Sequence, residues 1–446
     1  MGKRLAILFA LFALGLAGWE VVLQRRIDDL QFARRRVAFL ESENERLRAF
    51  LAGEEKKKAR AAEAEERAAV EKAVVAIRGL EFLKPVVYDV VTKQGIRETL
   101  RRKLSDLFTE TEFRDAATGY AAMGLMERGY PLREKYLDLL GEQVAAFYDQ
   151  HQHRLFMFKD ASLENSQNRV VLAHELTHAL QDQHFGLTNL PLELKNNDDQ
   201  TLAASALVEG DATMVMSEYM LKNFSWRGLR DNFSGMMSQN LNQLESAPRY
   251  LREMLVFPYL RGQEFCEALA ARGGYAAVSS AFAHPPSSTS QILHPEKYLA
   301  EPREEPQRIS WPETNVLGQA PLCDNVMGEM GVRVLLTDWV DPDTARNASA
   351  GWRGDRYLVY DEGGAVVWKT VWDAPENAAQ FIAALKRCLQ KRYKLSSSKI
   401  VESDGSFAVK EPRDILLLSP TPTEVLLLDA STARWADALA HAFAPR

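Results

Sequence analysis

Cysteine is scarce in this sequence of 446 residues, which holds three, at Cys266, Cys323 and Cys388, with no CxxC pair. This spacing excludes a zinc ribbon and a disulfide framework, so we expect the thiols to lie in the core. Positive charge is not in excess either, since 55 Lys and Arg stand against 61 Asp and Glu, a net charge of −6. Such a chain has no overall attraction for nucleic acid, and we expect no nucleic-acid partner.

The N-terminus lacks a full-length apolar span. The uncharged run from Leu5 to Trp19 holds fifteen residues, whereas a bilayer-spanning helix needs roughly 20. A cleaved secretory segment and a signal anchor both fit such a run, which follows the short basic start MGKR. We expect an uncleaved anchor over residues 1–24, because a charged helix follows it directly. This predicts a single-pass protein of the inner membrane whose body lies in the periplasm.

Residues 25–74 have the composition of a charged helical stalk that begins with a coiled coil. With Leu23 at heptad position a, the later a positions are Leu30, Val37, Asn44 and Leu51, and the d positions are Ala33, Leu40 and Leu47. A single polar a residue favours a parallel two-stranded coiled coil, so we expect a homodimer. A lone solvated helix is the alternative.

The rest of the chain is too long for one compact core, and we expect two domains. Residues 75–309 predict a mostly helical domain with a small β-hairpin, because VAAFYDQHQHRLFMF (144–158) places two apolar runs around a polar turn. Helices are expected at 163–184, ended by Gly186, and at 200–221.

Residues 310–446 predict a separate α+β domain. Strands are expected at 356–360, 365–371, 414–418 and 424–428, and helices at 377–393 and 431–443. Two segments rich in proline and polar residues, 302–313 and 337–349, predict loops. The predicted fold class is α+β: an N-terminal membrane helix and coiled coil, a mostly helical domain with a small hairpin, and the C-terminal α+β domain.

Histidine is scarce too, with eight in the chain, yet three fall within VVLAHELTHALQDQHFG (170–186). His174 and His178 form an HExxH motif, and on a helix these positions lie about 40° apart, so both imidazoles can share one metal ion. Glu175 comes out about 100° round the axis, outside the first shell but able to take a proton from a metal-bound water. Two core histidines without a metal are the alternative.

A third ligand could come from either of two residues. His184 stands where metzincins place theirs, but Gln181 occupies the position of the glycine that turns the chain there, so a continuing helix points His184 elsewhere. Glu209, in the apolar segment ALVEGDAT, is a buried carboxylate that needs a partner. We favour Glu209.

A polar, proline-rich segment, PPSSTSQILHPEKY (285–298), contains His294 and Tyr298. Zinc proteases need a donor aimed at the oxyanion that forms opposite the metal, and either side chain could supply it. A structural His within a loop is the alternative. His151 and His153, in the predicted hairpin turn, are expected to be solvated.

On these residues the chain resembles the gluzincin branch of the zinc metallopeptidases, and more closely a group of bacterial and archaeal membrane-associated metallopeptidase-like proteins. The resemblance rests on HELTHALQDQHF (174–185), LVEGDA (207–212), an STxQILHPEKY-like segment (288–298) and a GWxGDR…VWxTVWD pattern (351–373). It implies His174, His178 and Glu209 as ligands of Zn²⁺ and Glu175 as general base. Thr213 stands where familiar gluzincins often carry an Asp that orients the first His, and Asp211 is a possible substitute.

These observations predict zinc-dependent hydrolysis of peptide bonds in a peptide or protein substrate by a membrane-tethered metallopeptidase. Three protein ligands leave one position for a water, and Glu175 takes its proton. The alternative is a non-catalytic, membrane-tethered scaffold or binding protein with a structural zincin-like domain.

Overall fold

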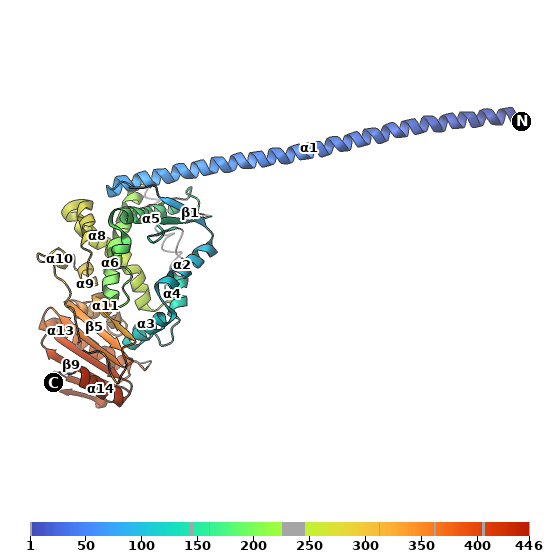
Figure 1. Cartoon of the computed structure of the whole chain (residues 1–446). Coiled ribbons are helices and arrows are strands. Elements are labelled where there is room, and N and C mark those ends of the chain that lie inside the picture. The colour runs from blue at the N-terminus through green and yellow to red at the C-terminus, as the bar shows by residue number, and fades with distance from the viewer. Residues whose placement is uncertain are drawn as a thin grey trace. The chain divides into compact units, whose positions relative to one another are not determined.

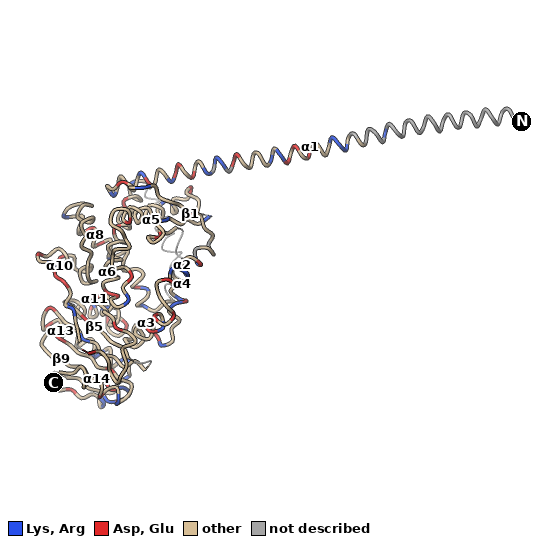
Figure 2. Tube along the Cα trace, viewed as in Figure 1, with Lys and Arg blue, Asp and Glu red and all other residues tan. Residues whose placement is uncertain are grey.

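The computed structural model (Figure 1) describes residues 2–142, 146–159, 161–224, 246–311, 313–360, 363–403 and 406–445. The chain divides into two compact units, Met1–Ala68 and Ala69–Arg446. The first unit is part of one long helix, α1 (Gly2–Arg78), and in the coloured portion of this helix in Figure 2 acidic and basic residues are interspersed. The charged helical segment predicted from the sequence is therefore observed as a helix.

Apolar side chains of α1 are solvent-exposed at the predicted coiled-coil positions. Val37, Leu40, Leu47 and Leu51 are 54%, 55%, 59% and 58% exposed in this single chain. Burying them against a second copy of the helix would remove them from water, as in a two-stranded coiled coil. Dimerisation through this segment stays a prediction.

Among the helices that the structure describes, none is both long enough and apolar enough to cross a membrane. The N-terminal membrane helix expected at residues 1–24 is therefore wrong, and so is the single-pass inner-membrane location that depended on it. The sequence contains the physical reason, because Glu20 ends the uncharged run after fifteen residues, fewer than the roughly 20 that a span needs.

The second unit begins with a three-stranded sheet of order β1-β3-β2. The predicted hairpin is observed as β2 (Ala146–Asp149) and β3 (Arg154–Phe158), which pair antiparallel. Strand β1 (Val87–Val91) adds to β3 in parallel and was not predicted. None of the residues in its short run VYDVV is fully buried, and the run has no clear apolar face. Helices α2 (Lys93–Leu107), α3 (Glu110–Met123) and α4 (Leu132–Glu142) lie between β1 and β2 in the sequence.

Three long helices, α5 (Ser166–Phe185), α6 (Asp198–Asn223) and α8 (Arg249–Ala283), form the centre of this part. The Asn165 side chain caps the start of α5, and Gly186, with a φ of 68°, ends it as predicted. A short turn, η1 (Leu187–Asn189), leads toward α6, and α9 (Thr289–Leu293) and α10 (Pro295–Leu299) follow α8.

Helices α6 and α8 cross at unusually close range. A Cβ atom at Gly210 of α6 would lie 2.1 Å from the carbonyl carbon of Gly262 in α8, and one at Gly262 would lie 2.0 Å from the Ala206 oxygen. Only glycine fits two backbones that approach so closely. This explains the glycine of the VEGDA segment by packing.

The C-terminal part contains a seven-stranded sheet of order β4-β5-β6-β10-β9-β8-β7, orange to red in Figure 1. Its strands are β4 (Cys323–Asn325), β5 (Trp352–Val359), β6 (Val366–Trp372), β7 (Ile400–Ser403), β8 (Ser406–Val409), β9 (Asp414–Thr421) and β10 (Glu424–Ala430). The helices here are α11 (Gly328–Thr337), α12 (Pro342–Ser349), α13 (Pro375–Arg392), η2 (Ser397–Lys399) and α14 (Ala433–Phe443). An α+β architecture is thus observed, although β4, β7 and β8 are too short to be evident in the sequence.

The loop predicted at 337–349 is wrong, because α12 lies within it. Asp341 accepts a hydrogen bond from the Thr344 amide, and Pro342 occupies the first turn. Asp followed by Pro is therefore the start of a helix here, a position where proline's missing N–H costs nothing.

One hydrophobic core extends through most of this unit. It joins Leu207 and Phe265 to Trp352, Trp368 and Phe381, on both sides of the boundary predicted at residues 309 and 310. A second core packs α5 against the last turns of α1 and the hairpin, and a third lies beneath α14. The three cysteines are buried and free, as predicted.

Candidate metal centre

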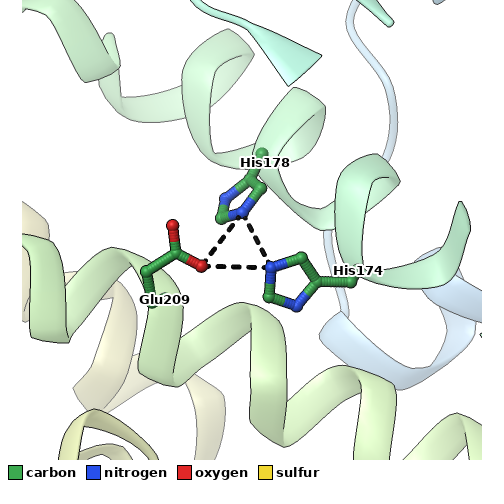
Figure 3. A group of neighbouring side chains, drawn as sticks. All are labelled: His174, His178 and Glu209. Carbon is green, nitrogen blue, oxygen red and sulfur yellow. Dashed lines mark hydrogen bonds and ion pairs between the residues drawn. The ribbon is translucent and has the colours of Figure 1, made fainter. Parts of the chain in front are cut away.

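Helices α5 and α6 bring His174, His178 and Glu209 to one point (Figure 3). The Nε2 atoms of His174 and His178 lie 3.1 Å apart, and the Glu209 Oε2 lies 3.1 Å from the first and 3.5 Å from the second. The i, i+4 spacing on α5 puts both imidazoles on one face. Glu209 points at them from the neighbouring helix.

These spacings fit a cation with tetrahedral coordination. Zinc binds His nitrogen and carboxylate oxygen at about 2.0–2.2 Å, which places neighbouring ligand atoms roughly 3.3–3.5 Å apart. The observed separations are 3.1, 3.1 and 3.5 Å. Two Nε2 atoms facing each other also require a proton or a cation between them, since two lone pairs repel. The donor set therefore suits one Zn²⁺.

The charges within the group are strongly coupled. Burial lowers the pKa of His178, but the Glu209 and Glu175 carboxylates have a larger, opposite effect, so the pKa rises to about 9. Burial raises the pKa of Glu209, and the two imidazoles more than offset this, so that it lies well below its usual range. The carboxylate is thus ionised, the state in which it binds a metal.

Glu175 lies beside this group and is held by the hairpin. Its Oε2 accepts a hydrogen bond of 2.7 Å from the backbone amide of Tyr148 in β2. Burial raises the Glu175 pKa, while His178 and His174 oppose the shift. A carboxylate with a raised pKa, placed next to a group of side chains that could hold a metal, has the properties of a general base.

The other ring nitrogens of the two histidines have different surroundings. The Nδ1 of His178 lies 2.9 Å from Oε1 of Gln181, a buried side chain on the same helix. The buried Nδ1 of His174 has no hydrogen-bond partner among the described residues. Asp211 does not touch either imidazole directly but contacts Gln181.

Tyr259, on α8, belongs to this site and was missed by the sequence reasoning. Its ring lies 5.9 Å from that of His174, nearly parallel at 27°, and 41% of the side chain is exposed. The Glu209 carboxylate, with burial second, raises the Tyr259 pKa well above its usual range. The hydroxyl therefore keeps its proton and can donate a hydrogen bond. The sequence holds only an indirect indication of this packing, which is Gly262, three residues later, where α8 meets α6.

In the structure, His294 and Tyr298 form hydrogen bonds with residues outside the candidate metal centre. The His294 imidazole lies 2.9 Å from Glu329, and the Tyr298 hydroxyl donates to the His284 carbonyl at 2.8 Å. His184, the other candidate ligand, lies 2.8 Å from the Glu81 carbonyl. These three side chains are therefore engaged outside the His174, His178 and Glu209 group.

The two histidines of the hairpin turn have acidic partners. His151 lies 2.8 Å from Glu193, and His153 lies 2.6 Å from Asp182. Both imidazoles are also partly exposed, at 42% and 51%. They are solvated in part, as expected, and also tie the turn to α5 and to the loop after it.

A cavity of about 510 Å³ lies between α2, α3, α4, the first turns of α6 and α8, the loop before α6, and β4. Thr201, eight residues before Glu209 on α6, contributes to its wall, as does Met254, five residues before Tyr259 on α8. Most of its lining is apolar and includes Leu104, Phe108, Phe113, Leu132, Leu192 and Leu251.

Comparisons with known proteins find one matching domain and one weakly similar solved structure. Residues 319–440, which contain the seven-stranded sheet, match a domain of unknown function (DUF8575). A crystal structure of "a putative hydrolase with a novel fold" from Chloroflexus aurantiacus is similar with a TM-score of 0.35 and 18% identity, over 54% of this chain and 89% of that one. A search of curated proteins finds no match.

Proposed function

We propose that this protein is a zinc-dependent peptidase. The observation that carries the proposal is the convergence of His174, His178 and Glu209 at tetrahedral spacing, with Glu175 beside them on α5, the helix that holds both histidines. Three protein ligands leave the fourth position of a zinc ion open, which is typical of catalytic rather than structural sites. When bound, zinc would lower the pKa of a coordinated water toward neutrality and polarise the substrate carbonyl.

The residues of the chain then have separate tasks. Glu175 takes the proton of the attacking water and returns it to the leaving amine. Its hydrogen bond from the Tyr148 amide fixes the carboxylate on the side of β2. Tyr259 donates a hydrogen bond toward the oxyanion that develops on the carbonyl oxygen. This proposal assigns to Tyr259 the role that the sequence suggested for His294 or Tyr298.

Two features support a peptide as the substrate. Strand β2 is an edge of its sheet, so an extended peptide backbone can pair with the groups of its open side other than the Tyr148 amide, which donates to Glu175. The apolar cavity of about 510 Å³ shares helices α6 and α8 with Glu209 and Tyr259 and can receive a large apolar side chain.

Metal analysis combined with turnover of a peptide library tests the proposal. The full-length protein should contain about one zinc per chain and cleave peptides. Glu175→Gln should keep the zinc and lose several orders of magnitude in rate, because an amide cannot accept the proton. Glu164→Gln, the same change at an exposed residue just before α5, is the control. Zinc without cleavage in the wild-type protein would favour the scaffold alternative instead.

A further inference from the structure

Gln181 occupies a buried position between the metal centre and a buried ion pair. It lies three residues after His178 on α5 and is fully enclosed. Its Oε1 is 2.9 Å from the Nδ1 of His178, and its Nε2 is 3.0 Å from the Val208 carbonyl and 2.9 Å from Oδ2 of Asp211. All three polar contacts of the side chain are within hydrogen-bonding distance.

The orientation of this amide follows from its partners. The Val208 carbonyl can only accept a hydrogen bond, so the NH₂ group of Gln181 must face it. The amide oxygen then faces His178, and an amide oxygen can only accept. The Nδ1 of His178 must therefore carry a proton, which leaves the Nε2 lone pair of the neutral ring free for a metal ion.

Asp211 holds the second N–H of the same NH₂ group. Its carboxylate is 0% exposed and lies 2.9 and 3.1 Å from Nε of Arg78, which is 1% exposed. Arg78 is the last residue of α1, and its guanidinium also lies over the Tyr275 ring at 5.0 Å. Arg78, Asp211 and Gln181 thus form one buried chain of contacts that ends at His178.

We propose that Gln181, held by the Val208 carbonyl and by the Arg78–Asp211 pair, is the positioning residue that fixes the tautomer and the orientation of His178 toward the metal. The inference rests on the proposed zinc site. In this chain the amide of Gln181 takes the place of the carboxylate or carbonyl that commonly accepts the second N–H of a metal-bound histidine. Asp211 supports the imidazole through Gln181, and not by direct contact.

Zinc affinity measured by chelator competition on the full-length protein tests this proposal. Gln181→Met preserves the approximate size of the side chain but removes the acceptor, and we expect a 10- to 100-fold loss of zinc affinity. Gln183→Met, two residues further on the same helix, is the matched control, because among the described residues the Gln183 side chain forms its hydrogen bonds with the backbone of Leu83 and Lys84. Its zinc affinity should stay within about twofold of wild type.

A spectroscopic measurement separates positioning from a general loss of structure. In the zinc-loaded wild type, ¹⁵N NMR should show a protonated Nδ1 on His178 whose proton exchanges slowly with solvent. In Gln181→Met this protection should be lost while the amide spectrum of the rest of the chain is retained.

Variants of Arg78 test the far end of the chain of contacts. Arg78→Lys keeps a cation beside Asp211 and should retain more zinc affinity than Arg78→Met. If Arg78→Met does not fold, the Gln181→Met measurement still decides. Wild-type zinc affinity together with a protected Nδ1 proton in Gln181→Met would overturn the inference. A wild-type protein that binds no zinc would instead refute the proposed function and, with it, the site on which this inference depends.

Discussion

Replacing Gly210 by alanine should disturb the metal centre without touching any of its side chains. The new Cβ would lie 2.1 Å from the Gly262 carbonyl carbon and 2.2 Å from its oxygen. These are backbone atoms, which cannot rotate away as a flexible side chain can. Restoring ordinary contact requires α6 and α8 to separate by roughly 1.3 Å, if atoms are to lie at least about 3.4 Å apart.

The cost can be estimated from the two opposing effects. Overpacking of a tight core contact destabilises by about 1–3 kcal/mol, and a backbone clash belongs at the upper end. Alanine is about 1 kcal/mol better than glycine within a helix, which offsets part of this. We therefore expect the free energy of unfolding to fall by about 2 kcal/mol. Because Glu209 and Tyr259 flank the crossing, a shift near 1 Å should also reduce activity by about 10²-fold.

Urea unfolding measures the loss of stability, peptide cleavage measures the loss of activity, and zinc chelator competition measures any change at the metal centre. Gly95→Ala is the control, because its Cβ would meet the nearest atom, Thr92 Oγ1, at 3.4 Å. That variant should be as stable as wild type or slightly more stable. If Gly210→Ala unfolded at the wild-type urea concentration and bound zinc equally well, the α6–α8 crossing would not position Glu209, and this reasoning would be refuted.

Three further predictions concern the ligands, the oxyanion donor and a buried carboxylate. Glu209→Ala should lose most zinc affinity while His184→Ala keeps it, because His184 contacts the Glu81 carbonyl; the reverse result in chelator competition would indicate a metzincin-like site. Tyr259→Phe should lower kcat by about 10²-fold with little change in zinc content, since one oxyanion donor is removed; an unchanged kcat would exclude the tyrosine from this role. Burial, with Asp355 and Glu329 contributing, raises the pKa of Asp199 to about 7, so the folded state binds a proton that the unfolded state releases. Stability should therefore fall as pH rises from about 4 through 7, and Asp199→Asn should remove this part of the dependence in urea titrations at several pH values; an identical pH profile in both proteins would contradict the assignment.

The parts of the site that were predictable from sequence depend on local geometry. His174, Glu175 and His178 lie on one helix, where spacing alone decides which side chains share a face. Glu209 was identified because a carboxylate in an apolar helix needs a partner. Their convergence in the structure matches the sequence expectation in position, while zinc itself remains a prediction.

The parts that were not predictable depend on how separate helices pack. Tyr259 reaches His174 only because α8 crosses α6 at Gly210 and Gly262. Gln181 looked in the sequence like a residue that merely keeps α5 helical. Its support of His178 becomes evident only when Val208 and Asp211 of α6 are in place beside it.

The remaining segments that carry the resemblance meet in a buried polar network at the other end of α6. Asp199, in its first turn, accepts hydrogen bonds from the Thr289 amide and hydroxyl. Glu329 lies 2.9 Å from His294. The third carboxylate, Asp355, accepts four hydrogen bonds, from the amides of Met327 and Gly328 and from the indoles of Trp352 and Trp368.

A buried carboxylate is stable only when hydrogen bonds compensate its desolvation, so each of these segments requires the others. This network accounts for His294 and for the GWRGD segment as parts of the fold. Helix α6 contributes a carboxylate to it through Asp199 and one to the candidate metal centre through Glu209. The packing of the C-terminal sheet therefore helps to fix the helix that carries the third ligand, which gives that sheet a structural role in the site even though it contributes no ligand.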